Sequence, residues 1–546
     1  MRNRSGFTLL AAGLLLWAGA AGAQEPQQIR VDSTAPPVEA IGVDVQDGAV
    51  LLTLDEAVEL ALRQNLGLSI QRYTRDRARL GVEQALGIYD LFANGTLYAE
   101  DLETPTASRL QASESNEQRF IFGFDQLFPT GGNLNLGWSS IRRESNNPFQ
   151  TVNPSYSSSM TFFLRQPLLR DFGRLATERE LMVARNRSQA SREEFERQLV
   201  LTVQDVIEAY WNLVGARRQL VVAQESLNLA RELHERNRIQ VEVGTMAPLE
   251  LVQSEAAIAE RDEGIITAQG LLGDAEDALR RLLDLPEGAL WDTEIRPVTD
   301  PAIQHTPIDV EAAIQLAMAE RPELRTQQLN IAQAQIELEF ARNQEKPRLD
   351  FEVSYGFGGV GGDVAVFDED SGEIIDIIPG GFGDSFSQVS GLSFPGWTAE
   401  LIFGFPIQNR GARAARAIAN VDLERAETTL EDLRKGIITE VRAAARQVET
   451  AAKQIDAAKA SRSFQERNLD AERKRYENGM STSFQITQIQ EDVTEARRRE
   501  VFAINNYRRV LADFQRTTGR LLEEEGIVIE DQEPEVDRWQ FSLWGR

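Results

Sequence analysis

An internal repeat constrains the fold of this 546-residue chain more than any other feature. Residues 237–283 align with residues 472–518 at a constant offset of 235 positions and without a gap, so that Gly244 falls on Gly479. Earlier segments share apolar positions in the same way: residues 53–68 and 309–324. A long alignment that keeps the same order of segments indicates two structural repeats.

Apolar residues in the first repeat recur every seven positions in two adjacent columns, which is the spacing of helices that pack as in a coiled coil. The columns are Leu199, Val206, Leu213, Leu220 and Leu227, and Val200, Ile207, Val214 and Val221. The second repeat keeps this spacing at Val441, Val448, Ile455 and Leu469. We expect a continuous helix over about 175–243, which at about 1.5 Å per residue is roughly 100 Å long. No compact domain needs that length, whereas a rod that spans the periplasm does.

A short reversal follows each long helix. Val243-Gly244-Thr245 and Asn478-Gly479-Met480 each place a glycine where a helix can end in the left-handed conformation. Thr245, and a residue within 481–483, then offer an N-cap for the returning helix. The sequence therefore predicts two antiparallel helical hairpins with narrow tips.

Five segments alternate apolar and polar residues with the period of a β-strand. Their apolar positions are Phe120, Phe122 and Phe124; Leu134, Leu136 and Trp138; Met160, Phe162 and Leu164; Leu349, Phe351, Val353, Tyr355 and Phe357; and Trp397, Ala399, Leu401, Phe403 and Phe405. This alternation fits the wall of a transmembrane β-barrel, and it also fits a soluble antiparallel sheet with one buried face. The rod-like helices, and the export signal described next, favour the transmembrane barrel over the soluble sheet.

The start of the chain has the features of an export signal. Arg2 and Arg4 precede an apolar stretch over 7–18, and Ala21-Gly22-Ala23 is a small-x-small cleavage site, so residues 1–23 are expected to form a signal peptide. The chain has no Cys, two His and a formal charge of −27. This composition excludes Cys-ligated and His-rich metal sites, and an acidic chain is a poor match for the phosphates of nucleic acid.

One chain has too few strands to close a sizeable pore, and its helices carry too many charges for one dry bundle. Several copies around a symmetry axis remove both difficulties. Thr53 and Glu56 form a capping box that predicts a first helix from Thr53 to about Tyr89. The expected divisions after the signal peptide are a linker at 24–50, a first repeat at 51–300, a second repeat at 301–526 and a C-terminal tail at 527–546.

Several short motifs occur in the same order in a known family. They are the two repeat openings at 54–62 and 310–324, Gln166-Pro167-Leu168-Leu169 with Gly173-Arg174, Phe405-Pro406-Ile407 with Gly411, and the two tip sequences. In this order and layout the chain resembles the TolC-like outer-membrane efflux proteins over residues from about 50 to 525.

The resemblance implies a mixed α and β fold in a homotrimer. It implies a 12-stranded β-barrel in the outer membrane that continues into a 12-helix α-barrel across the periplasm. It also implies an exit duct for efflux or type I secretion, in contact with outer-membrane lipids, with an inner-membrane transporter as partner. A periplasmic adaptor protein would grip the tips at Val243, Gly244 and Thr245 and at Asn478, Gly479 and Met480. No cofactor is implied.

Two departures from the family pattern concern the gate and the strands. The family's gate has Asp six and nine positions after the second tip glycine, where this chain has Gln485 and Gln488; the first repeat has Glu250 and Gln253. Glu250 is either part of an anionic constriction or a solvated helix residue. The strand region at 93–167 is long enough for four strands instead of two, which would make an 18-stranded trimer, although we expect 12.

A second function class remains open on the sequence: a periplasmic coiled-coil scaffold or adhesin with a soluble β head. Enzymatic activity is not expected, because no Gly-rich phosphate loop, HExxH or GxSxG motif is present. Fractionation separates the two classes, since a channel stays with the outer membrane and a scaffold is released with the soluble periplasm.

Overall fold

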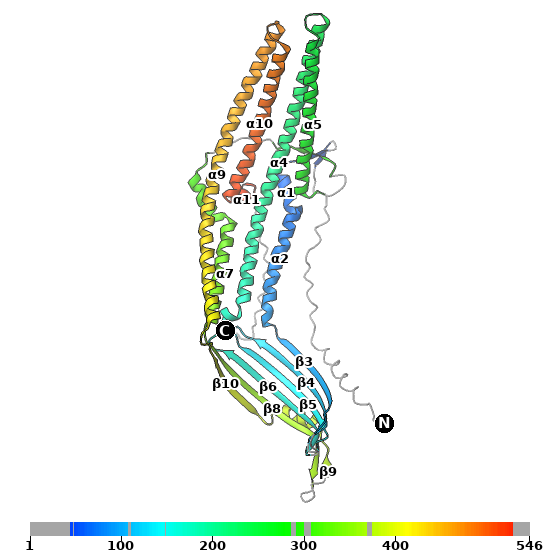
Figure 1. Cartoon of the computed structure of the whole chain (residues 1–546), viewed down its shortest axis with the longest axis vertical. Coiled ribbons are helices and arrows are strands. Elements are labelled where there is room, and N and C mark those ends of the chain that lie inside the picture. The colour runs from blue at the N-terminus through cyan, green and yellow to red at the C-terminus, as the bar shows by residue number, and fades with distance from the viewer. Residues whose placement is uncertain are drawn as a thin grey trace, which may run out of the picture.

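The computed structural model describes residues 44–46, 49–106, 111–147, 149–285, 291–299, 307–367 and 374–527. The expected signal peptide, most of the expected linker and nearly all of the expected tail lie outside these residues. The chain is elongated, with a curved β-sheet at one end and two helical hairpin tips side by side at the other (Figure 1). In the described residues, no helix has both the length and the hydropathy needed to cross a bilayer.

Two repeats of one element order make up the helical part. The first contains α1 (Leu54–Gln64), α2 (Leu66–Leu86), a short 3₁₀ turn η1 (Gly87–Tyr89), α3 (Arg174–Thr177), α4 (Arg179–Glu242) and α5 (Leu249–Leu283). The second contains α6 (Val310–Glu320), α7 (Pro322–Gln344), α9 (Arg410–Glu477), α10 (Ser483–Thr517) and α11 (Leu521–Glu524). Helix α4 packs against α5 within its own hairpin and against α10 of the other, so the two hairpins form one body.

The expected single helix from Thr53 to Tyr89 is wrong in one respect, because it breaks at Asn65. The predicted capping box is present, with Thr53 and Glu56 bonding each other's backbone amides. Asn65 has an extended ψ of 121°, its side-chain oxygen accepts from Leu68 N (3.1 Å), and its side-chain nitrogen donates to Leu282 O (2.9 Å). Arg321 makes the equivalent break in the second repeat, where Pro322 begins α7.

A small sheet joins the ends of the first repeat. It has the order β1-β2-β7, with strands β1 (Asp44–Gln46), β2 (Ala49–Leu52) and β7 (Glu294–Pro297). Strands β1 and β2 are formed by the last residues of the expected linker and the first of the expected repeat. Tyr210 of α4 is fully buried beside this sheet and donates a hydrogen bond to Leu52 O (3.0 Å).

The large sheet contains six long antiparallel strands in the order β10-β8-β6-β5-β4-β3 among the described residues. They are β3 (Phe92–Glu103), β4 (Glu114–Leu127), β5 (Asn133–Ser145), β6 (Val152–Pro167), β8 (Arg348–Phe367) and β10 (Gly396–Gly404). A short strand, β9 (Ile374–Ile378), pairs with the far end of β8. The expectation that the strand region at 93–167 supplies two strands is therefore wrong, because this region supplies four, β3 to β6.

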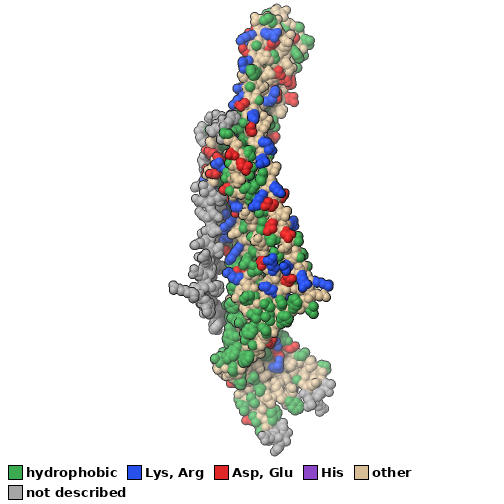
Figure 2. Space-filling model, turned by 90° about the vertical axis from the view of Figure 1, so that its left-hand side faces the viewer, with side chains coloured by type: hydrophobic (Ala, Val, Ile, Leu, Met, Phe, Trp, Pro, Cys, Tyr) green, Lys and Arg blue, Asp and Glu red, His purple; other side chains and the backbone are tan. Residues whose placement is uncertain are grey.

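The seven-residue columns form the seams between the long helices, as the sequence predicts. The buried residues of these columns are Leu199, Val206, Leu213 and Leu227 on α4, and Val441, Val448, Ile455 and Leu469 on α9. Of the second column, Val221 is 50% exposed. Charged side chains are scattered over the helical part of the face in Figure 2, whereas hydrophobic side chains gather on the sheet near the helices.

Candidate functional site

Both hairpin tips turn through the same backbone motif. Gly244 and Gly479 have φ of +77° and +72°, in the left-handed region that favours glycine. Around Gly244, the amide of Gly244 bonds Val241 O (3.0 Å) and the amide of Thr245 bonds Gln240 O (2.9 Å). This is the Schellman pattern, and the second tip repeats it. The predicted turn geometry of both tips is confirmed.

The two tips differ in how the returning helix starts. Thr482 caps α10 by accepting from Gln485 N (3.4 Å), within the predicted range 481–483. The prediction that Thr245 caps α5 is wrong: α5 begins at Leu249 without a side-chain cap, and Thr245 donates its hydroxyl to Gln240 O instead. Pro248 precedes Leu249 and restricts where the helix can begin. All six predicted tip residues are exposed; the exposed fraction is 68% for Val243 and 62% for Met480.

A buried polar network joins the two hairpins next to the tips. The Tyr476 hydroxyl donates to Asn237 Oδ1 (2.6 Å), and Asn237 Nδ2 donates to Ser483 Oγ (2.8 Å). Asn237 is fully buried, and its partner Tyr476 packs in one apolar cluster with Leu233 and Ile486. Burial, and next the Glu250 carboxylate, raise the pKa of Tyr476, so its hydroxyl remains protonated at neutral pH. One chain's hairpins are therefore held together by hydrogen bonds as well as by apolar contact.

The sequence contains a signal for this network in the seven-residue spacing of α4. Asn237 follows Ala223 and Ala230 at the seven-residue spacing, and both alanines are buried. A polar residue in an otherwise apolar column of a coiled coil is typical of a position that fixes how the helices pair. Its partner Tyr476 could not be identified from spacing, because the two residues lie 239 positions apart.

The four candidate gate residues lie within the first two turns of the returning helices. Glu250 is half-buried on α5, and its Oε2 atom is buried with no hydrogen-bond partner in the described chain. Gln253, Gln485 and Gln488 are exposed on α5 and α10. Gln485 Oε1 accepts from Ser481 Oγ (3.0 Å). Among the described residues, no hydrogen bond joins these four side chains to one another, and a shared ring would require further copies.

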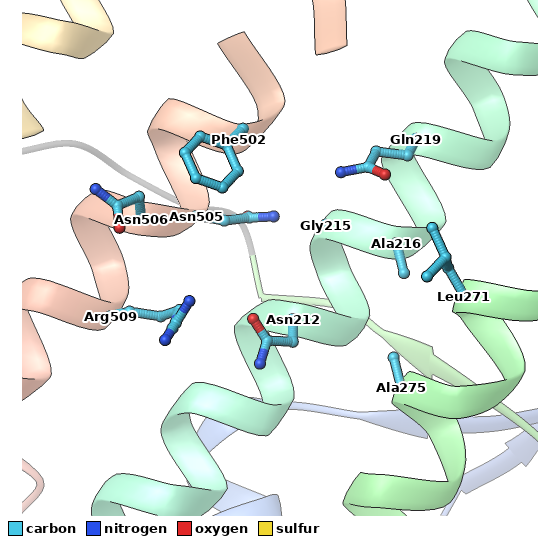
Figure 3. A pocket seen from close by; sticks show the side chains of 10 residues that line it. All are labelled: Asn212, Gly215, Ala216, Gln219, Leu271, Ala275, Phe502, Asn505, Asn506 and Arg509. Atoms are coloured by element: carbon cyan, nitrogen blue, oxygen red, sulfur yellow. The ribbon is translucent and has the colours of Figure 1, made fainter. Parts of the chain in front are cut away.

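Further along the seam between α4 and α10, small and polar residues replace the apolar contacts. Thr494 donates to Ser226 Oγ (3.0 Å) inside the seam. The Asn505 side chain of α10 points at Gly215 of α4, where an added Cβ would lie 1.7 Å from Asn505 Nδ2 (Figure 3). A cavity of about 220 Å³ opens beside them, between α4, α5 and α10. Gly215 thus allows these two helices to approach closely.

The six long strands carry two chemically different faces. On one face Asp125 accepts from Asn94 (2.6 Å) and Asn135 (2.8 Å), and Asp350 accepts from Arg165 (2.6 Å) and Arg348 (2.7 Å). The other face carries the apolar residues that the sequence predicts, together with Leu97 of β3, and the registers place them in rows across the strands: Phe120, Phe122, Phe124, Trp138, Met160, Phe162, Tyr355, Phe357, Trp397 and Leu401. A wall of this kind separates water from an apolar medium.

A helix absent from the sequence predictions covers part of the apolar face. Helix α8 (Phe382–Ser390) crosses β8 and β6, and its phenylalanines meet Trp138. A Cβ at Gly359 or Gly361 would lie 2.2 Å or 2.3 Å from backbone oxygens of the α8 segment, so glycine allows the close approach. The described residues between 358 and 396 thus belong largely to the end of β8, to β9 and to α8.

A charged cluster at the break between α6 and α7 also connects this part of the second repeat to α9 and α10. The Arg321 side chain is 7% exposed and hydrogen-bonds Glu323 and Glu440. Arg516 of α10 donates to Glu440 (2.7 Å) and Asp513 (2.9 Å). Burial raises the pKa of Glu440, but the hydrogen bonds from Arg321 and Arg516 outweigh burial and hold it below its usual value.

The arrangement of sheet, long helices and tips is found in known proteins. A family model described as outer membrane efflux protein matches residues 126–284 and 313–520. No match was found among curated protein sequences. The CmeC outer membrane channel of Campylobacter jejuni is 16% identical, with a TM-score of 0.63 over 86% of this chain and 89% of that chain.

Two further solved structures share the fold. The outer membrane protein VceC of Vibrio cholerae is 13% identical, with a TM-score of 0.60 over 85% of this chain and 96% of that chain. The open MtrE outer membrane channel of Neisseria gonorrhoeae is 16% identical, with a TM-score of 0.59 over 86% and 89%. Because the family model matches most of both repeats, the chain belongs to the outer membrane efflux protein family, and it is an outer-membrane channel that extends into the periplasm.

Proposed function

We propose that three copies of this chain form one continuous conduit, with the sheets in the outer membrane and the helices in the periplasm. Within the described residues, β3 and β10 each pair on one side only. Because the strands between them alternate in direction, the two edges run antiparallel to each other. Head-to-tail pairing of β10 with β3 of the next copy then closes a ring. The polar face lines the water-filled interior and the apolar face meets lipid.

The proposed adaptor site consists of the tip residues Val243, Gly244 and Thr245 and Asn478, Gly479 and Met480. Channels of this family work with an adaptor and an inner-membrane transporter in tripartite pumps. Both tips are exposed, and two backbone turns of the same shape present two similar surfaces per chain. The repeats at 51–300 and 301–526 thus each supply one docking hairpin. The observation that carries the proposal is this pair of matching Schellman turns at the end away from the sheet.

For the gate, we favour a ring of Glu250 over one of glutamines. Glu250 has a buried carboxylate oxygen without a partner in the described chain, whereas Gln253, Gln485 and Gln488 are exposed and uncharged. Three Glu250 carboxylates around one axis would repel one another. An adaptor that binds the open tips more tightly than the closed tips shifts the equilibrium toward opening. The duct itself carries out no bond chemistry.

The test is a change of tip backbone that leaves everything else in place. Gly244→Val and Gly479→Val each force a branched residue into the left-handed region, at a cost of about 1–2 kcal/mol, without a steric clash nearby. We expect the double variant to lose export of pump substrates, and to lose cross-linking to the adaptor, while trimers still reach the outer membrane.

Gly436→Ala is the matched control, because Gly436 lies inside α9 with open space around it and no left-handed φ. This variant should export normally. Full export by the tip double variant, at equal trimer levels, would remove the tips from the adaptor site.

A further inference from the structure

We propose that the hairpin β3–β4 is an insertion into the barrel wall, so that the trimer has 18 strands and a wider outer-membrane pore than a 12-stranded barrel. This inference deepens the proposed trimeric conduit and rests on it. It also concerns cargo, because the bore of the wall sets the largest cross-section that can leave through it.

The two repeats show which strands are additional. In the second repeat the chain passes from α7 to α9 through the long strands β8 and β10. In the first repeat it passes from α2 to α4 through β3, β4, β5 and β6. Strands β5 and β6 lead into α4 as β8 and β10 lead into α9. The pair without a counterpart is therefore β3–β4.

The family comparison independently separates the same hairpin. In the second repeat the family match begins at residue 313, inside α6 and before the strands. In the first repeat it begins only at residue 126, at the end of β4, so α1, α2 and nearly all of the hairpin precede it. An insertion between α2 and β5 accounts for this difference, because it interrupts the pattern that the repeats otherwise share.

The hairpin is built like the rest of the wall. Its strands have 12 and 14 residues, and a strand needs about 9–11 to cross a bilayer. Leu97 pairs with Phe120, and Phe122 with Trp138, so the apolar rows run across the hairpin onto β5. On the other face Asp125 of β4 bonds Asn94 of β3 and Asn135 of β5. The hairpin thus shares both the lipid face and the water face.

The pairing of β5 excludes the narrower wall in the conformation described. A ring built from four strands per chain would need β5 to pair with β10 of the next copy. That edge of β5 is instead bonded to β4 along the register from Ser115↔Ser145 to Leu127↔Asn133. The edge available for the neighbour is β3, where Leu97 is 67% exposed, opposite a β10 edge where Leu401 is 64% exposed.

The gain in width is substantial. Barrel diameter grows roughly linearly with strand number, so 18 strands give about one and a half times the diameter of 12. Barrels of about 16–18 strands leave an open aqueous channel. Neutral polymers added on the extracellular side should therefore enter this barrel at sizes that a 12-stranded barrel rejects.

The direct test uses cysteine pairs in the full-length trimer, since the native chain has no Cys to give background. Leu97→Cys on β3 is combined in turn with Ala399→Cys, Leu401→Cys or Phe403→Cys on β10, which sample three registers on one face. We expect one combination to form disulfide-linked dimers and trimers on oxidation. Phe122→Cys with Trp138→Cys, which are direct neighbours, is the control for cross-linking within a chain.

The competing wall is tested with Leu136→Cys on β5 and the same three β10 positions. Cross-links between β5 and β10 of adjacent copies, or trimers without any β3–β10 product, overturn the 18-stranded wall but keep the trimer. A protein that stays monomeric in detergent overturns the conduit itself. Images of the trimer along its axis, with 18 or 12 strands resolved, decide independently of the substitutions.

Discussion

At the scale of single residues, hydrogen bonds near the tips determine how firmly the two hairpins of one chain are held together. Asn237 is buried between Tyr476 and Ser483, and each contact crosses from one repeat to the other. A buried amide that loses its partner keeps the cost of desolvation, so this network favours one arrangement of the hairpins. Any opening that separates α4 from α9 and α10 has to break it.

Tyr476→Phe should therefore make the tips easier to open. Loss of one buried hydrogen bond that leaves an unpaired acceptor costs about 1–3 kcal/mol per chain, which favours states in which Asn237 can reach water. We expect more frequent opening of purified trimers in single-channel recordings. Tyr73→Phe, at a 55% exposed position on α2, is the control and should leave the recordings unchanged. Equal opening in both variants would show that the network does not restrain the tips.

At the scale of elements, the charged cluster around Glu440 joins the α6–α7 break to α9 and α10. The folded-state pKa of Glu440 lies below its ordinary value of 4.5, because Arg321 and Arg516 stabilise the carboxylate more than burial disfavours it. A lowered pKa contributes stability that is complete above the ordinary value. That contribution is lost as the pH falls through the folded-state pKa.

Glu440→Gln should lower the melting temperature of the helical part at pH 7. Arg321 is buried, and in this variant it keeps only Glu323 of its two carboxylate partners. The difference from wild type should shrink below about pH 4, as measured by circular dichroism melts over a pH series. Glu449→Gln is the control: its partner Lys453 is exposed, and surface pairs contribute little. A pH-independent difference would exclude titration of Glu440 as the cause.

Long periodic elements were predictable from the sequence, and short interruptions were not. Seven-residue columns indicate α4 and α9, and glycine followed by hydroxyl residues indicates the tips. The break at Asn65 lies inside a continuing apolar pattern and is revealed by its contact with Leu282, whereas Pro322 is a local sequence signal for the break at Arg321. The sequence of β3, FANGTLYAEDLE, alternates only weakly and therefore does not predict a separate strand. Its place in the wall comes from pairing with β4, which periodicity within one segment does not report.

At the scale of the whole molecule, the apolar face of the sheet decides where the protein is stable. Trp397, Leu401 and Phe403 on β10 are 73%, 64% and 68% exposed. Soluble monomeric proteins rarely expose a contiguous apolar patch of this kind. The soluble scaffold or adhesin is not supported by the family match, and this exposed face argues against it as well. Lipid and the next copy of the chain are the expected neighbours.

Adjacent residues on β10 test this directly. Leu401→Arg puts a charge on the lipid face, and the cost of such a charge ranges from about 1 kcal/mol near the interfaces to about 2–4 kcal/mol at the middle of a bilayer. We expect it to reduce the amount of trimer recovered by detergent from the outer membrane and dissociated only on heating. Ile402→Arg, one residue further on the opposite face, should be tolerated. Equal loss in both variants would contradict the assignment of the two faces.

The even number of strands in the wall has a consequence for how such channels can change size. Every strand that leaves the periplasm must be matched by one that returns, or α4 would be made on the wrong side of the membrane. The segment between α2 and α4 can therefore grow only by complete hairpins, as β3–β4 illustrates. In a trimer, each added hairpin of two strands therefore adds six strands to the wall. Bore in this architecture then varies in discrete sizes, six strands apart, and never by gradual adjustment.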